Sequence, residues 1–231
     1  MPPTESCYPS LAKVLESPQR AKMGKRSNTS DAVFLNVPYD QQFQPLYLAF
    51  IAGLSGFGLV PHAVLEIPTS ERRLDRILSL IRTCGISFHD LSRVELDPAR
   101  PRTPRFNMPF ELGLVVALQR GWHRSHQWYV FEAKAHRAEK SLSDLKGTEV
   151  HIHRARPRGV LQELTNILIR ISHQPTVAQL EGILRDLNAV ARKIAKEGRS
   201  KSLFETRAFV DLVAAAKVIA PKHVASLSEH H

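Results

Sequence analysis

The segment 105–114 carries the side chains best suited to chemistry, and it reads Arg-Phe-Asn-Met-Pro-Phe-Glu-Leu-Gly-Leu. Apolar residues continue at helical spacing to Leu118, so we predict a helix with Pro109 in its first position. Glu111 would then lie in the first turn, where the positive end of the helix dipole favours an ionised carboxylate. An ionised glutamate can stabilise or attack a sugar carbon that is losing its leaving group. The alternative is that Glu111 only caps its helix.

Further polar side chains follow the apolar runs that we predict to be strands. An amide, a phenol and a carboxylate follow the first run, acids and arginines follow the second, and an acid, a hydroxyl and an arginine follow the third. Each has a structural alternative, because the same residue types cap helices, hold turns or form surface ion pairs. The candidates are Asn36, Tyr39, Asp40, Glu66, Asp90, Ser92 and Arg93, with Arg105 and Asn107 beside Glu111.

Short apolar runs alternate with helical patterns from residue 31 onward. The predicted strands are 32–37, 59–67, 86–91, 127–132 and 148–153. Such alternation is typical of right-handed βαβ units, so we expect an α/β fold with a flavodoxin-like, doubly wound, five-stranded parallel sheet. Ligands of such sheets bind outside the carboxyl ends of the strands. The candidate residues follow three of these ends, and the helix with Glu111 returns to the same edge.

The sequence divides into three parts. We predict a polar, basic leader over residues 1–30, an α/β domain over residues 31–173 and a C-terminal helical extension over residues 174–231. In the extension we predict a hairpin of helices 177–197 and 204–219, with Pro221 after the second helix. The hairpin could pack on the sheet domain or on a second copy of the chain as a homo-oligomer.

Net charge and hydropathy restrict the partners. The formal net charge is +10, with a nearly neutral central part and basic flanks, which argues against a broad phosphate-binding face on the core. The basic C-terminal part could meet nucleic acid or an acidic partner, or be a solvated helical face, and no nucleic-acid-binding motif accompanies it. No apolar run is long enough to span a membrane and no secretion signal is present, so we expect a cytoplasmic protein.

Several motifs of common enzymes are missing. Neither a G-x-G-x-x-G fingerprint nor a Walker sequence occurs, which disfavours a classical dinucleotide fold and a phosphate-loop nucleotidase. His151 and His153 have no further ligand at zinc spacing, so we expect no metal site. There is no G-x-S-x-G elbow, and Cys84 lies in an apolar stretch, which argues against serine or cysteine hydrolysis.

The combined motifs resemble bacterial TIR-like and nucleoside 2-deoxyribosyltransferase-like domains over about residues 32–172. The motifs are Asn36-x-Pro38-x-Asp40, Glu66, Arg73-Leu74-Asp75, His89-Asp90-Leu91-Ser92-Arg93 and Arg105-Phe106-Asn107-Met108-Pro109-Phe110-Glu111-Leu112-Gly113. The resemblance implies that Glu111 acts on the bond between an anomeric sugar carbon and a base, with Asp90 assisting protonation. The Ser/Cys-x-x-Trp-Cys context of the best-known TIR enzymes is absent, which leaves the substrate open.

The resemblance gives an order of expected functions. The first is an N-glycosidase that cleaves the base–ribose bond of NAD or a related nucleotide, as an effector of antiphage defence; the nucleotide is the substrate, and no cofactor is required. The alternatives are a nucleoside or deoxynucleoside transferase or hydrolase, and a non-catalytic nucleotide sensor that signals through the C-terminal helices. Nicotinamide leaves as a neutral base, so one carboxylate suffices to stabilise the oxocarbenium-like transition state.

The resemblance also implies how the other candidates would share the work. Asn36, Tyr39 and Asp40 would contact ribose or base, and Asp90 and Ser92 would orient the sugar. Arg105 or Asn107 would contact phosphate or hold Glu111.

Overall fold

The computed structural model describes residues 31–66, 72–93, 100, 102–121, 125–169, 174–198 and 200–224. The predicted leader 1–30 lies outside the described residues. Within them the chain forms a five-stranded, all-parallel sheet in the order β2-β1-β3-β4-β5, which confirms the flavodoxin-like fold class. The strands are β1 (Ala32–Asn36), β2 (Val60–His62), β3 (Ile86–Asp90), β4 (Gln127–Glu132) and β5 (Val150–Ile152).

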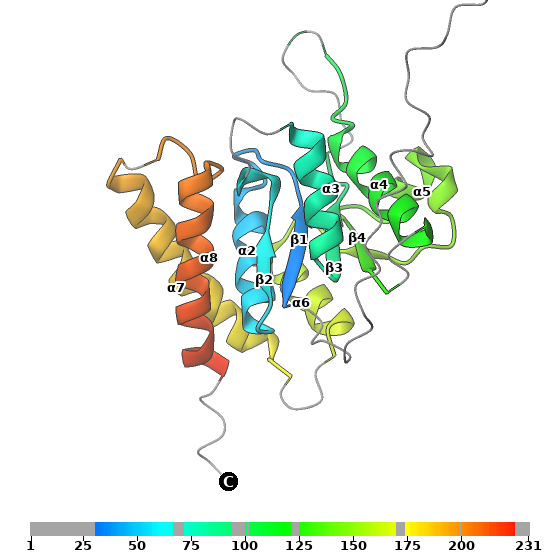
Figure 1. Ribbon diagram of the computed structural model, residues 1–231. Helices are drawn as coiled ribbons and strands as arrows, with labels where there is room; N and C mark the ends of the chain where they lie inside the picture. The colour runs from blue at the N-terminus through cyan, green and yellow to red at the C-terminus, as the bar shows by residue number, and fades with distance from the viewer. Residues whose placement is uncertain are drawn as a thin grey trace, which may run out of the picture.

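Helices cover both faces of the sheet. The α-helices are α2 (Gln44–Gly56), α3 (Arg73–Thr83), α4 (Asn107–Gly121), α5 (Arg137–Ser141), α6 (Pro157–Ile167), α7 (Val177–Lys196) and α8 (Thr206–Val224), and short 3₁₀ turns are η1 (Val64–Glu66) and η2 (Ser143–Leu145). Helices α2 and α6 share one core with one face of the sheet, and α3 and α4 pack on the other. The hairpin of α7 and α8 lies outside α2 as a further layer (Figure 1).

The second layer explains the composition of α2. Every residue from Leu46 to Gly56 is buried, because one side of the helix faces the sheet and the other faces the hairpin. Gly53 allows α6 to approach closely, since a Cβ there would lie 2.5 Å from Cδ1 of Leu164. Buried residues of the hairpin, among them Leu180 and Phe209, belong to the same core. In this single chain the hairpin therefore covers its own sheet domain.

Two predicted boundaries were wrong. The second strand ends at His62, and residues Val64–Glu66 form the turn η1 instead of continuing the strand. Pro61 fits within β2 because β2 is an edge strand and needs few ladder donors. Helix α8 continues through Pro221 to Val224, so this proline lies inside the helix, where it removes one N–H donor without ending the helix. Among the described residues, no helix is both long and apolar enough to cross a membrane.

Candidate functional site

Glu111 lies deeper in its helix than the sequence indicated. Helix α4 begins at Asn107, so Pro109 is its third residue and Glu111 follows the first turn. The predicted position of Pro109 was therefore wrong. The carboxylate is also beyond the turn in which the helix dipole acts most strongly.

The amide of Asn36 fixes the start of α4 to the end of β1. Its Nδ2 donates to the Met108 carbonyl oxygen at 3.2 Å and to Nδ1 of His89 at 2.9 Å. Asn36 and His89 face each other in the register of β1 and β3, and both are buried. Asn36 was predicted to contact ribose or base, but both hydrogens of its amide are engaged within the protein. Its role in the structure is to position α4, and with it Glu111.

A buried polar chain extends from Asn36 toward the other end of β3. The links of 2.9 Å run from His89 Nε2 to Ser87 Oγ, from Ser87 Oγ to His126 Nε2, and from His126 Nδ1 to the Cys84 carbonyl oxygen. A carbonyl can only accept, so His126 donates to it, Ser87 donates to His126, and His89 donates to Ser87. Burial, with His126 nearby, lowers the pKa of His89 to about 3. His89 is therefore a neutral structural residue.

The Glu111 carboxylate is nearly enclosed and only partly compensated. Its side chain is 2 % exposed, and its Oε1 lies 3.9 Å from Nη2 of Arg73, longer than a hydrogen bond. Its Oε2 is buried and has no hydrogen-bond partner within the described part of the chain. Burial raises the pKa of Glu111 to about 7, against the opposing effect of the Arg73 charge. Desolvation therefore opposes the helix dipole, which was expected to favour the ionised carboxylate.

Tyr39 connects Glu111 with the C-terminal hairpin. Its hydroxyl donates to the Leu35 carbonyl oxygen at 3.3 Å. Its ring centroid lies 6.4 Å from that of Tyr47 and 6.0 Å from that of Phe204. Burial raises the pKa of Tyr39 well above its ordinary value, and the Glu111 charge adds to the shift. The phenol is thus neutral and lies within the electrostatic reach of Glu111.

Asp40 ties the loop after β1 to the loop after β3. Its carboxylate accepts two hydrogen bonds from Arg93, at 2.7 and 2.8 Å, and one from the Phe43 N–H at 2.9 Å; Nη1 of Arg105 lies 3.5 Å away. Partial burial would raise the pKa of Asp40, but the hydrogen bonds from Arg93 and Phe43 and the arginine charges lower it below its ordinary value. The structure therefore brings Asp40, Arg93 and Arg105 together as one cluster.

Asp90 is fully buried and holds the loop that follows β3. Its Oδ1 accepts the Ser92 N–H at 2.9 Å, and its Oδ2 lies 3.0 Å from Nε2 of His153, which is also 3.1 Å from Ser92 Oγ. Nδ1 of His153 accepts the Ala155 N–H at 3.1 Å, so the ring proton resides on Nε2. Because Nε2 of His153 already carries a proton, it cannot take one from Ser92. The three side chains are a structural cluster and lack the proton path of a serine hydrolase.

Asp90 and Glu111 lie on opposite faces of the sheet. Phe88 belongs to the core shared with α2 and α6, whereas His89 reaches the α4 side through Asn36. Side chains alternate along a strand, so Asp90 projects to the Phe88 side. The structure does not bring Asp90 into contact with Glu111 in the described part of the chain.

The two remaining predicted residues are separate from this group. Glu66 closes its own turn, with Oε2 at 3.1 Å from both the Ala63 N–H and Nδ1 of His62. Asn107 is exposed at the first residue of α4. Neither side chain contacts Glu111 among the described residues.

Sequence reasoning missed two features of the site. Arg73 was noted as part of the motif Arg73-Leu74-Asp75, and no local signal pairs it with Glu111, which follows 38 positions later. Arg137 pairs with the buried carboxylate of Glu132 and also donates to the Ser92 carbonyl oxygen at 2.8 Å. Glu132 ends the predicted fourth strand. A buried acid at the end of an apolar strand needs a partner, so the sequence did contain a signal for this pairing.

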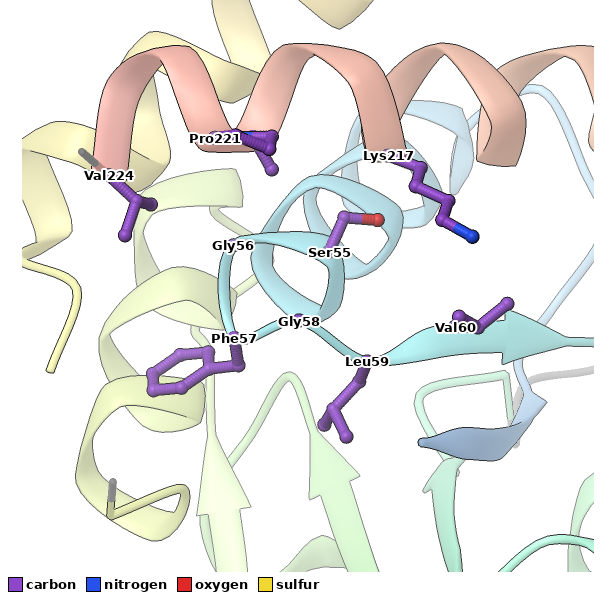
Figure 2. A pocket seen from close by; sticks show the side chains of 10 residues that line it. Ser55, Gly56, Phe57, Gly58, Leu59, Val60, Lys217, Pro221 and Val224 are labelled. Carbon is purple, nitrogen blue, oxygen red and sulfur yellow. The ribbon is translucent and has the colours of Figure 1, made fainter. Parts of the chain in front are cut away.

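Two cavities lie at opposite ends of the sheet domain. One of about 510 Å³ lies beside Tyr39 and Asp40, against the connection between α7 and α8. Another of about 480 Å³ lies between α8 and the end of α2, and Figure 2 shows Pro221 and Lys217 on the side of α8 that faces Ser55. The latter adjoins the start of β2, so it lies at the amino ends of the parallel strands, away from Glu111.

Metal-ligating residues do not gather at either end: the described ranges contain no group of three or more His, Cys, Asp or Glu side chains that could hold an ion. The residues near Glu111 thus offer one buried carboxyl, one guanidinium, one phenol and fixed backbone.

No family model and no curated protein matches this chain.

Proposed function

We propose that this protein is an N-glycosidase that cleaves the bond between base and ribose in NAD or a related nucleotide. Glu111 would stabilise or attack the anomeric carbon as the base departs. The observation that supports the proposal is the buried Oε2 of Glu111, which has no hydrogen-bond partner among the described residues. Helix α4 is tied through Asn36 to the carboxyl end of β1, the edge at which ligands of such sheets commonly bind. A buried carboxyl without partners destabilises a fold, and functional sites are where such costs are commonly retained.

The charge of NAD fits this carboxylate. With a pKa of about 7, Glu111 can gain or lose its proton near neutral pH. The nicotinamide ring of NAD is a cationic pyridinium, so its arrival beside Glu111 would favour the ionised form. As the bond breaks, the positive charge moves from the ring to the sugar, where an adjacent carboxylate stabilises it. Nicotinamide then leaves as a neutral molecule without needing a proton.

The raised pKa also supports a second candidate, which is cleavage or transfer of a nucleoside or deoxynucleoside base. Neutral purines and pyrimidines leave more readily when they are protonated, and a carboxyl with a pKa near 7 can supply a proton. Asp90, the residue proposed from the resemblance for this step, lies on the opposite face of the sheet, where its Oδ1 accepts the Ser92 N–H. In this candidate Glu111 itself would be the proton donor.

Release of free base separates these candidates. The full-length protein would be incubated with NAD, with nucleotides and with deoxynucleosides, and the released base measured by chromatography. We expect nicotinamide from NAD with the wild-type protein and at least a hundredfold less with Glu111→Gln. Release from deoxynucleosides alone would favour the second candidate. Nucleotide binding without any release would contradict both and support a sensor.

Glu139→Gln is the matched control for this assay, because Glu139 is exposed on α5 and its substitution removes the same charge. A role in antiphage defence is part of the proposal on the resemblance alone. It predicts that phage infection halts growth of bacteria that produce the wild-type chain, but not of those that produce Glu111→Gln.

A further inference from the structure

The C-terminal hairpin contributes one wall of a polar cavity next to Tyr39. The opposite wall comes from the loop after β1 and the start of α2, through Asp40 and Gln44. The hairpin supplies Arg192 of α7 and the segment 200–204. The cavity has a volume of about 510 Å³, which lies in the range of small-molecule sites.

Contacts fix the hairpin segment against the sheet domain at this cavity. The Tyr47 hydroxyl donates to the Leu203 carbonyl oxygen at 3.3 Å, and the Phe204 ring lies 5.1 Å from that of Tyr47. Thr206 Oγ1 donates to the Leu65 carbonyl oxygen at 2.6 Å. Figure 1 shows the connection between α7 and α8 at the same end of the molecule as the loop that follows β1. The cavity is therefore built by two segments far apart in sequence.

Two cationic side chains, Arg192 and Lys201, line the cavity. Neither the Arg192 guanidinium nor the Lys201 ammonium forms an ion pair or a side-chain hydrogen bond with another described residue. The one carboxylate in the wall is Asp40, and its charge is met by Arg93 at 2.7 Å and Arg105 at 3.5 Å. The cavity thus presents two cations, while the Glu205 carboxylate nearby accepts the Lys201 backbone N–H at 3.0 Å.

An unpartnered hydroxyl lies in the same wall. Ser200 Oγ is buried and has no hydrogen-bond partner in the described part of the chain. Buried hydroxyls are almost always satisfied by protein, water or ligand. A hydroxyl, a guanidinium and an ammonium that line one cavity are a donor set that suits phosphate oxygens.

We propose that this cavity binds the phosphate group of a nucleotide through Arg192, Lys201 and Ser200. Tyr39 lines this cavity and also lies within electrostatic reach of Glu111, so the cavity adjoins the surroundings of that carboxylate. Binding at the cavity does not depend on the proposed reaction. Phosphate binding at this cavity would give the hairpin a function in addition to covering α2.

Calorimetric titration of the full-length protein with AMP and with adenosine tests the proposal. We expect AMP to bind and the double variant Arg192→Gln/Lys201→Gln to weaken AMP binding at least tenfold, while adenosine binding stays the same. The control is Arg185→Gln/Lys222→Gln, which removes the same charge from exposed positions outside the cavity and should leave AMP affinity unchanged. Equal AMP affinity in wild type and cavity variant, or equal losses in both double variants, would overturn it.

A titration with inorganic diphosphate tests whether the cavity holds the phosphate of the bound nucleotide or a separate phosphate group. Competition between diphosphate and AMP, lost in the cavity variant, would show that the nucleotide itself carries its phosphate into the cavity. If diphosphate and AMP bind at the same time, and the cavity variant weakens only diphosphate binding, the proposal that the cavity holds a nucleotide's phosphate is contradicted. Because these titrations measure binding, an inactive Glu111 would not affect their interpretation.

Discussion

The substitution Glu111→Gln should stabilise the protein at alkaline pH, because the wild-type carboxylate is buried without adequate compensation. Burial raises the pKa of Glu111 from its ordinary value of 4.5 to about 7. Below pH 4.5 the carboxyl is protonated in both the folded and the unfolded chain, so it has no effect on the pH dependence. Between pH 4.5 and 7 the unfolded chain loses this proton first, and the free energy of unfolding therefore falls as pH rises.

The size of the effect follows from the shift. Each pKa unit corresponds to about 1.4 kcal/mol, so the free energy of unfolding of the wild-type protein is about 3 kcal/mol lower at pH 8 because of this group. Glutamine has nearly the same shape and is neutral at every pH. We therefore expect the stability of Glu111→Gln relative to wild type to increase by roughly 2–3 kcal/mol between pH 5 and pH 8.

Urea unfolding of both proteins at pH 5, 6, 7 and 8, followed by circular dichroism, measures this difference. Glu139→Gln is the control, because substitution of this exposed residue should change stability by less than about 0.5 kcal/mol at each pH. A stability difference between Glu111→Gln and wild type that does not change with pH would refute the reasoning. So would a variant that is less stable than wild type at pH 8.

Three further substitutions test the surroundings of Glu111. Arg73→Gln removes the charge that lowers the pKa of Glu111, so the pH at which base release reaches half its maximum should rise; an unchanged pH–rate profile would exclude this pairing. Asn36→Ala removes the amide that donates to His89 and Met108. We expect urea unfolding to show a free energy of unfolding that is about 2–4 kcal/mol lower, and we expect slower base release. Gly159→Ala places a Cβ against the His153 backbone and should cost roughly 1–3 kcal/mol in thermal unfolding, whereas a wild-type melting temperature would contradict that contact.

Local patterns were enough to predict the sheet and most helices. The run from Gln127 to Glu132 was predicted with the same bounds as β4, because a buried parallel strand is a short continuous apolar segment. Helix α7 was predicted within one residue, since its apolar spacing is regular and Gly198 ends it. Pro221 misled the prediction of α8, because a proline near the end of a helix signals a stop whether or not the chain turns there.

The environment of the candidate residues could not be read from the sequence. The sequence placed Asp90 and Glu111 at the same edge, but strand alternation and packing direct them to opposite faces. The pKa of Glu111 depends on how completely α4, the sheet and Arg73 enclose it, which is a tertiary property. The cavity at Arg192 likewise depends on how the hairpin folds back, and helical periodicity does not contain that information.

The central claim is that Glu111 cleaves the bond between base and ribose. The most direct test is the rate of nicotinamide release from NAD by the wild-type protein and by Glu111→Gln, measured at pH 7.5 with equal amounts of folded protein. We predict release by the wild type and a decrease of at least a hundredfold in the variant. Equal release by both proteins, or none by the wild type while the nucleotide is bound, would contradict it.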